Sequence, residues 1–332
     1  MAKSSLSLAQ AIDGFLLDCA ARRLSAHTVR DYSTTLRKFA AFAGEDASAG
    51  GEVPLASIDA TTIRRFMAFL GTPQPGGGAV AREPRPLSKK TSLNYHTGLS
   101  ALWQWALGEG LVERNVVRDV EPPRAERTAI VPLSQADVKA LLKACELTRE
   151  YGRDGKRVCA NARPTALRDK TLILILLDTG LRASEVCGIT ARDVDLKNRR
   201  IWTMGKGDKE RSVPISAETA KALWHYMNER SEAKASAPLF ATVDGRPFSR
   251  TALLALLADL GEKADILDVH PHRFRHTFAI NFLRNGGNIF ELQMALGHSS
   301  LEMVRRYLAL AETDLERAHE EASPVNRWRL KM

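Results

Sequence analysis

The chain contains little cysteine. Its 332 residues include four, and no two of them form a C-x-x-C pair. They are Cys19, Cys145, Cys159 and Cys187. This wide spacing argues against a zinc ribbon and against the disulfide framework of a small secreted domain. We therefore expect reduced thiols that bind no metal.

Long hydrophobic runs are also missing. The longest, Leu172 to Leu177, is far shorter than the roughly 20 residues that a membrane-spanning helix needs. Near the N-terminus, Asp13 and Asp18 interrupt the only apolar stretch, so a secretory signal peptide is not expected. The sequence therefore predicts a soluble cytoplasmic protein with no membrane partner.

The charge balance favours a polyanionic partner. Lys and Arg number 48 against 39 Asp and Glu, which leaves a net charge of +9 and a pI near 9.5. Many basic proteins bind no nucleic acid, so charge by itself does not decide the function. The length is sufficient for two domains with separate cores.

The first 120 residues have the pattern of helices joined by loops. Apolar residues recur at helical spacing after Ser25 and again after Ser88, and both serines suit a helix N-cap. A shorter helix is expected over Ile58 to Leu70. The segment from Pro73 to Pro86 contains three consecutive glycines and predicts a loop, and Glu121 to Thr128 predicts an extended linker.

The second half begins with a helix at Ser134 and continues mainly as helices. Arg149 to Arg168 carries six basic and two acidic residues and predicts a solvated surface loop. A buried helix over Asp169 to Asp178 is expected to stop at Gly180, which places Arg182 just beyond its end.

Three short strand-like stretches follow, near residues 194–196, 201–204 and 211–215, with Lys206 at a hairpin tip. Further helices are expected over 271–285 and 290–296, and one more carries Tyr307. The predicted fold class is mainly α with a small antiparallel β-sheet, an α+β arrangement.

Six residues in this half suit the cleavage of a phosphodiester. They are Arg182, Lys206, His272, Arg275, His298 and Tyr307. A tyrosine hydroxyl can attack phosphorus, but its ordinary pKa of about 10 makes it a weak nucleophile. Guanidinium groups can hold the charge that gathers on the phosphate oxygens, and a lysine can protonate the leaving 5′ oxygen. Histidines can move protons or donate hydrogen bonds, so no metal and no cofactor is required.

The sequence resembles the tyrosine recombinases, the phage integrase and Xer-type family, from Ser25 to Tyr307. Four motifs in the family's order carry the resemblance, and a tyrosine follows the last of them. The motifs are T-G-L-R-A-S-E at 179–185, G-K-G-D-K-E-R at 205–211, P-H-x-x-R-H at 271–276 and L-G-H-S-S at 296–300.

The resemblance implies a site-specific recombinase that cuts and rejoins duplex DNA. Tyr307 would attack one strand and leave a 3′-phosphotyrosyl link with a free 5′ hydroxyl, and strand exchange would pass through a Holliday junction. Arg182 and Arg275 would clamp the phosphate, and Lys206 would protonate the leaving oxygen. His272 and His298 would assist these transfers.

The family's architecture implies a helical, SAM-like core-binding domain over residues 1–122, a linker over 123–130 and a catalytic domain with a C-terminal tail over 131–332. The two domains would form a clamp around DNA. The helices that begin at Ser25 and Ser88 would lie against the duplex. Candidate DNA contacts are Thr28, Arg30, Lys89 and Lys90.

The partners implied by the resemblance are double-stranded DNA with paired recombination sites and further copies of the chain. A monomer in solution would assemble into a homotetramer on DNA. Whether a second recombinase or a DNA-bending protein joins this assembly is left open by the sequence. The amphipathic tail beyond Tyr307 either docks on a neighbouring protomer, as in the family, or packs on its own subunit. Because the core-binding domain would start at residue 1, we expect no N-terminal arm-binding domain.

The biological role has two readings. The basic stretch over 149–168 is longer than the compact Xer pattern needs, which favours a recombinase of a mobile element over chromosome resolution.

Other functions share parts of this pattern. His270 and His272 match the histidine spacing of metal-dependent rolling-circle nucleases and relaxases, although Arg273 and Arg275 would repel a cation. A type IB topoisomerase uses the same covalent chemistry. A zinc site at His272 and His276 lacks a third ligand of a typical kind, and an inactive DNA-binding protein would not need every catalytic position filled.

Overall fold

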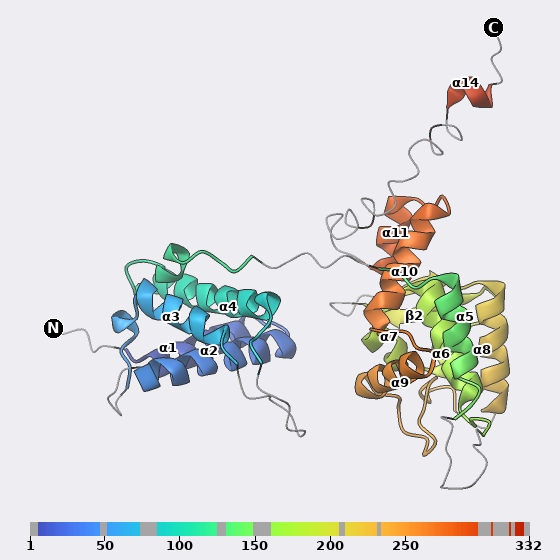
Figure 1. Cartoon of the computed structure of the whole chain (residues 1–332), viewed down its shortest axis with the longest axis horizontal. Helices are drawn as coiled ribbons and strands as arrows, with labels where there is room; N and C mark the ends of the chain where they lie inside the picture. Colours follow the sequence, from blue (N-terminus) through green and yellow to red (C-terminus); the bar gives the residue numbers. More distant parts are fainter. Residues whose placement is uncertain are drawn as a thin grey trace. The chain divides into compact units, whose positions relative to one another are not determined.

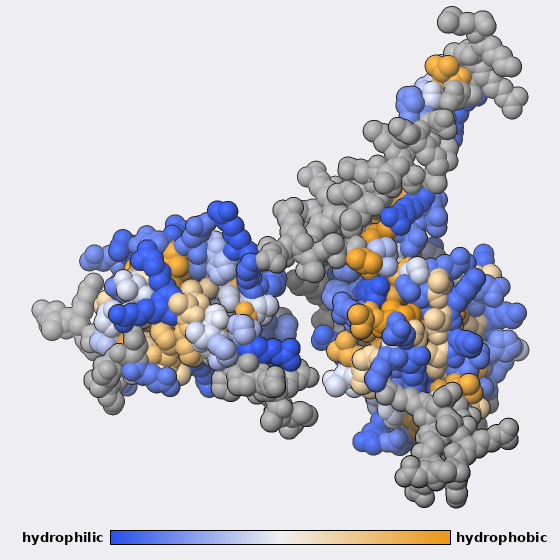
Figure 2. All heavy atoms as spheres, in the orientation of Figure 1, coloured by the Kyte–Doolittle hydropathy of each residue, from blue (hydrophilic) through white to orange (hydrophobic). Residues whose placement is uncertain are grey.

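The computed structural model describes residues 6–46, 52–73, 85–124, 131–148, 161–205, 210–230, 234–297, 307, 319 and 323–328. The chain divides into two compact units, an N-terminal unit over Met1–Thr128 and a C-terminal unit over Ala129–Met332 (Figure 1). On the face drawn in Figure 2, hydrophilic side chains cover much of the described surface of both units. No described helix has the length and apolar character that a bilayer crossing requires.

Within its described residues, the N-terminal unit is built from four helices. They are α1 (Leu8–Ala21), α2 (Ala26–Asp46), α3 (Ala60–Leu70) and α4 (Lys89–Gly108), with short 3-10 turns at Leu55–Ser57 and Val116–Asp119. The predicted caps are confirmed: Ser25 Oγ accepts from the Thr28 amide at 3.1 Å, and Ser88 Oγ accepts from the Thr91 amide at 3.1 Å. Each cap satisfies an amide that has no partner within the helix.

Aromatic packing forms the core of this unit. The ring of Phe39 lies edge-on to Phe66 and Trp103, with centroid distances of 5.0 and 5.9 Å, and all three side chains are buried. Edge-to-face pairs add to the stabilisation from burial alone. The apolar stripe predicted after Ser25 therefore faces the core, and Arg30 on the same helix is exposed.

The C-terminal unit combines helices with a small sheet. Its elements are α5 (Gln135–Ala144), α6 (Ala166–Thr179), α7 (Ala183–Gly188), a 3-10 turn (Ala191–Asp193), β1 (Val194–Asp195), β2 (Arg200–Met204), β3 (Glu210–Pro214), α8 (Ala217–Glu229), α9 (Arg250–Lys263), α10 (Pro271–Arg284), α11 (Ile289–Leu296) and α14 (Pro324–Arg327). The strands form an antiparallel sheet in the order β1-β2-β3, with Ile201 opposite Val213. The predicted fold class, mainly α with a small antiparallel sheet, is confirmed.

Burial of α6 fixes the frame of this unit. Leu172, Ile173, Ile175 and Leu176 are fully buried, and the helix packs against both α8 and α10. Gly180 ends α6 with a φ of 59°, a left-handed conformation that glycine adopts without steric cost.

The expectation of a solvated loop over Arg149 to Arg168 is wrong for two of its arginines. Arg163 and Arg168 donate to the fully buried carboxylate of Asp169 at 2.7 and 2.8 Å, and their side chains are only 13% and 12% exposed. A buried carboxylate requires such partners. These two arginines therefore serve the packing of α6, and residues 149–160 lie outside the described part of the chain.

Candidate active site

The turn after α6 brings three elements into close contact. A Cβ atom at Gly180 would lie 2.5 Å from Cδ1 of Phe278 on α10 and 2.9 Å from Cδ2 of Leu296 on α11. Only a glycine permits this approach at the observed φ. The end of α6, the face of α10 and the end of α11 therefore meet where the candidate residues lie.

Arg182 is held by an acidic neighbour. Its backbone amide and its Nη1 atom donate to the two carboxylate oxygens of Glu185, at 2.8 and 2.9 Å. Glu185 also accepts two hydrogen bonds from Arg211 on β3, at 2.9 and 3.0 Å. Burial by itself raises the pKa of Glu185, but the hydrogen bonds and charges of Arg211 and Arg182 outweigh burial, and the pKa lies below its ordinary value. The carboxylate is therefore charged and fixes both guanidinium groups.

Arg275 is buried within α10. Its Nη1 and Nη2 atoms donate to the carbonyl oxygens of Gly180 and Leu296 at 2.7 and 2.8 Å. Burial, followed by the charge of Arg182, lowers the pKa of Arg275 to about 10, so the group stays charged at neutral pH. Carbonyl oxygens at the ends of two helices supply the polar partners that this charge needs.

The two arginines converge on one carbonyl group. Arg182 Nη1 lies 3.4 Å from the Leu296 oxygen that also accepts from Arg275, and its Nη2 lies 3.5 Å from the Gly297 oxygen. Two guanidinium charges are thus fixed side by side with Arg182 partly exposed. Such an arrangement is suited to an anion with several oxygens, such as a phosphodiester.

His272 lies beside these arginines. It lines a cavity of about 370 Å³ together with Arg182 and Arg275, and the exposed Arg250 of α9 lies at the same cavity. Partial burial, then the charges of Arg275, His270 and Arg182, lower the pKa of His272 below its ordinary value. The imidazole is therefore neutral at pH 7, with one nitrogen that donates and one that accepts.

Tyr307 belongs to the same part of the C-terminal unit. Its side chain is 5% exposed and packs in a cluster with Ala279, Ile280, Leu292 and Leu296. Its Oη atom lies 2.8 Å from Nδ1 of His276, one turn of α10 beyond His272. Arg275 also interacts electrostatically with Tyr307. The structure therefore joins four of the six predicted residues, Arg182, His272, Arg275 and Tyr307.

The other predicted residues lie elsewhere. Lys206 and His298 fall outside the described residues. Thr28, Arg30, Lys89 and Lys90 belong to the N-terminal unit, where the last three are exposed and Thr28 is half-buried. Thr28 Oγ1 forms a hydrogen bond of 2.8 Å with Ser25 Oγ as part of the helix cap.

Four residues at the site received no role from the sequence, namely Glu185, Arg211, Arg250 and His276. The position of Glu185 three residues after Arg182 is a capping-box spacing, and His276 follows His272 by one helical turn. Both spacings can be recognised in the sequence. The contact between Arg211 and Glu185 and the place of Arg250 at the cavity depend on tertiary packing.

The metal-binding alternative finds no support in the described residues. His270 caps α10, and its Nδ1 atom accepts from the Arg273 amide at 3.3 Å. No cluster of three histidine, cysteine or acidic side chains within the described ranges is arranged to hold a metal ion.

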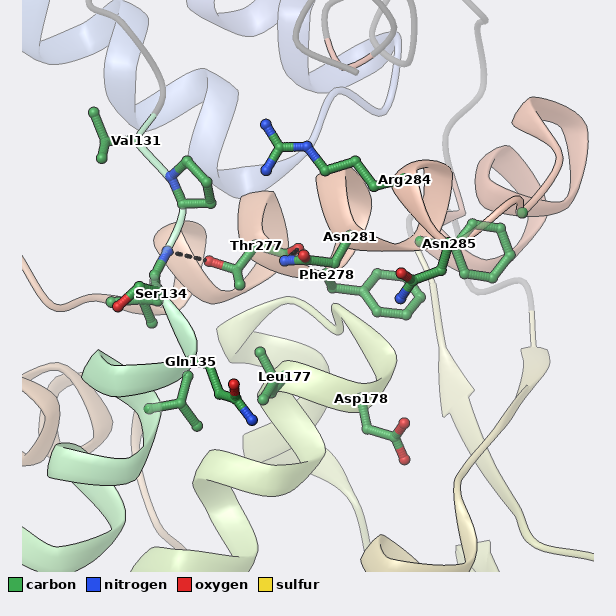
Figure 3. A pocket seen from close by; sticks show the side chains of 15 residues that line it. Val131, Ser134, Gln135, Leu177, Asp178, Thr277, Phe278, Asn281, Arg284 and Asn285 are labelled. Carbon is green, nitrogen blue, oxygen red and sulfur yellow. Dashed lines mark hydrogen bonds between the residues drawn. The ribbon is translucent and has the colours of Figure 1, made fainter. Parts of the chain in front are cut away.

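A larger pocket of about 790 Å³ lies on another side of the C-terminal unit. Figure 3 shows its walls, made by residues 131–135 together with α6 and α10, with Leu133 donating to Thr277 Oγ1 at 2.8 Å. It shares no lining residue with the cavity beside Arg182, His272 and Arg275, which we call the arginine cavity. The volume of a pocket therefore does not by itself identify the candidate active site.

Comparison with known proteins finds matches along most of the chain. A model of the phage integrase family matches residues 132–314, and a model of the phage integrase SAM-like domain matches residues 12–121. A tyrosine recombinase XerC from Pelobacter propionicus is 29% identical over 307 residues, which cover 92% of each chain. A tyrosine recombinase XerC from Bacillus subtilis is 30% identical over 245 residues, 72% of this chain and 76% of the relative.

A solved structure has the same fold. The Tn1549 transposon integrase in complex with transposon right end DNA superimposes with a TM-score of 0.71 at 22% identity, covering 96% of this chain and 99% of that one. The family match also decides against the relaxase and topoisomerase alternatives.

Proposed function

Because the chain belongs to the phage integrase family of tyrosine recombinases, the enzymes that cut and rejoin DNA, we propose that Tyr307 is its nucleophile. The Oη atom forms a bond to the scissile phosphorus while the bond from phosphorus to the 5′ oxygen breaks. The products are a 3′-phosphotyrosyl link and a free 5′ hydroxyl. Attack of a 5′ hydroxyl from a partner duplex reverses the step through a Holliday junction.

The convergence of Arg182 and Arg275 on the Leu296 carbonyl carries this proposal. Both guanidinium groups are fixed before DNA arrives, Arg182 by Glu185 and Arg275 by two backbone carbonyls. Preorganised donors of this kind stabilise the charge of the pentavalent phosphorus without reorganisation during the reaction. His272 has a place in the same cavity, where a neutral imidazole can donate to a phosphate oxygen.

Lys206 and His298 complete the proposal through their motifs. Lys206 is assigned the protonation of the leaving 5′ oxygen, and His298 assists the transfers of the phosphoryl group. Both roles rest on the family resemblance. The chemistry needs no metal and no cofactor.

The proposed partner is double-stranded DNA with paired recombination sites. Residues 1–122 would form the core-binding domain, 123–130 the linker and 131–332 the catalytic domain. Exposed Arg30, Lys89 and Lys90, with Thr28, are the proposed contacts of the first domain. Cations of this kind position a protein on the phosphate backbone without reading sequence.

The proposed assembly is a monomer in solution and a homotetramer on cytoplasmic DNA. A pocket of about 790 Å³ on the C-terminal unit supports contacts between copies (Figure 3), as do the exposed side chains of Val325 on α14 and Trp328 just after it. A second recombinase or a DNA-bending protein would join this assembly at some sites. The substrate is a site of a mobile element or an Xer-type resolution site.

Covalent trapping tests the assignment of Tyr307. The protein is incubated in EDTA with nicked duplexes from its own genomic neighbourhood, and adducts that survive SDS are counted. We expect an adduct joined to the 3′ phosphate, absent from Tyr307→Phe and retained in Tyr226→Phe. Tyr226 is a matched control because it is equally buried in the same unit. An adduct that persists in Tyr307→Phe, or one joined at the 5′ side, would contradict the proposal.

A further inference from the structure

The polar face of α10 carries a second histidine next to the proposed nucleophile. His276 follows His272 by one helical turn, and the two rings stack with a centroid distance of 5.9 Å and an interplanar angle of 28°. His272 lines the arginine cavity, whereas His276 contacts the tyrosine. The two histidines therefore differ in what they touch.

The contact with the tyrosine is direct. His276 Nδ1 lies 2.8 Å from Tyr307 Oη, a normal distance for a strong hydrogen bond to a hydroxyl group. The ring centroids are 5.5 Å apart and the rings are tilted by 53°, and the hydroxyl meets the imidazole edge at Nδ1. The packing of Tyr307 against Ile280 and Leu296 holds the ring in place.

We propose that His276 is the group that accepts the proton of the Tyr307 hydroxyl when Tyr307 attacks the phosphorus. This inference rests on the proposed role of Tyr307. In the tautomer that the reaction requires, Nε2 carries the ring proton and Nδ1 accepts from Oη. His276 then touches a reacting atom and is a catalytic residue.

The step balances within the site. The O–H bond of Tyr307 breaks, its proton moves to Nδ1, and the oxygen electron pair forms the bond to phosphorus. His276 becomes an imidazolium ion, and in the reverse reaction it returns the proton to the tyrosine. The leaving 5′ oxygen takes its proton from a different donor, so the two proton transfers occur at opposite ends of the phosphate.

Neighbouring charges favour this role. Arg275 interacts electrostatically with Tyr307, and its positive charge stabilises negative charge on the phenolic oxygen. Arg182 and Arg275 are themselves charged at neutral pH and have no lone pair that can accept a proton. Among the described side chains at the arginine site, the imidazole of His276 combines an acceptor nitrogen with hydrogen-bond distance to the nucleophile.

The variant His276→Asn separates proton transfer from positioning. The Oδ1 atom of an asparagine can occupy the place of Nδ1 and accept the hydrogen bond, but it cannot retain a proton at neutral pH. We expect the single-turnover rate of adduct formation on the nicked duplex to fall about 100-fold, with DNA affinity unchanged. His225→Asn on α8, which replaces an exposed histidine of the same unit, should react at the wild-type rate.

A more acidic nucleophile should restore the rate. Incorporation of 3-fluorotyrosine at position 307 lowers the pKa of the phenol and reduces the need for a base. We expect it to recover most of the rate lost in His276→Asn while changing the wild-type rate little. A fluorinated His276→Asn protein that stays as slow as the unfluorinated one would overturn the proton-acceptor role.

The outcomes also separate this inference from the assignment of the nucleophile. If Tyr307→Phe still forms the adduct, the nucleophile has been assigned wrongly. If Tyr307→Phe is inactive and His276→Asn reacts at the wild-type rate, only the role of His276 is refuted. A measurement without DNA tests the hydrogen bond directly. The ¹³Cζ NMR signal of Tyr307, identified by its loss in Tyr307→Phe, should shift between wild type and His276→Ala, which has no acceptor at this position. No shift would contradict the hydrogen bond.

Discussion

At the scale of single residues, the site depends on one buried carboxylate. Glu185 is 4% exposed at its side chain and pairs with Arg182 and Arg211, whose side chains are 31% and 16% exposed. Removal of one member of a buried ion pair leaves the other charges without compensation. Glu185 therefore contributes to the stability of the fold and to the position of Arg182.

Glu185→Gln should destabilise the C-terminal unit by about 2 kcal/mol at pH 7, a value below that of a fully buried pair because Arg182 is partly solvated. The pKa of Glu185 is lowered in the fold, so its contribution is present above its ordinary pKa of 4.5 and is lost as the pH falls through the lower folded value. Denaturant unfolding at pH 7, 4 and 3 should show the difference between wild type and variant shrinking.

The exposed Glu218 of α8 provides the control for this experiment. Glu218→Gln should change stability by no more than about 0.5 kcal/mol. A difference between wild type and Glu185→Gln that stays constant down to pH 3 would show that the carboxylate charge is not responsible.

At the scale of secondary-structure elements, the packing of α6, α10 and α11 against one another determines where Arg182 and Arg275 lie. Gly180 provides the close approach at the end of α6, and its carbonyl oxygen accepts from Arg275. The last carbonyl groups of a helix have no partner within the helix. At the ends of α6 and α11, such carbonyl groups accept hydrogen bonds from the guanidinium group of Arg275. The ends of α6 and α11 thus fix the guanidinium group that is proposed to bind the phosphate.

Gly180→Ala should destabilise the C-terminal unit by about 2 kcal/mol or more, because the added Cβ atom collides with Phe278 and Leu296 and the φ is left-handed. It should also slow adduct formation by displacing Arg182 and Arg275. Gly188→Ala at the end of α7 is the matched control, since its Cβ meets nothing within 4 Å. Thermal unfolding and trapping of both variants check this, and equal stability of the two would contradict the packing argument.

At the scale of the whole molecule, the net charge of +9 is consistent with a polyanionic partner, and part of that charge lies on the N-terminal unit. Lys89 and Lys90 are exposed in the first turn of α4, where the helix dipole disfavours cations. A bound phosphate would offset this cost. Their placement therefore fits an electrostatic contribution to DNA binding rather than to folding.

The double variant Lys89→Ala/Lys90→Ala should weaken binding to any duplex. The slope of log K against log salt should fall by about 0.9 for each lysine that neutralises a phosphate, without loss of folding stability. Binding measured at several salt concentrations checks this. Lys139→Ala/Lys143→Ala, which removes two exposed lysines from α5, is the control for net charge. Equal slopes for the two double variants would contradict a contact by Lys89 and Lys90.

The local features of the fold were predictable from the amino-acid sequence. Ser25, Ser88 and Gly180 predicted where helices begin and end, since capping and left-handed turns depend on nearest neighbours in the chain. The short strand-like stretches near 194–196, 201–204 and 211–215 predicted the sheet, and the order of the motifs around Arg182 and Tyr307 indicated the chemistry. Each of these signals is short-range or rests on residue identity.

The contacts between residues of different elements depend on the tertiary structure. Arg275 is buried against the carbonyl groups of Gly180 and Leu296, and Arg211 pairs with Glu185. Both contacts join residues from different parts of the fold. The contact between His276 and Tyr307 spans 31 positions. Helical periodicity predicts which residues share a face of a helix, but it does not predict which element packs against that face. A charged side chain is buried only where the fold supplies polar groups that compensate its charge.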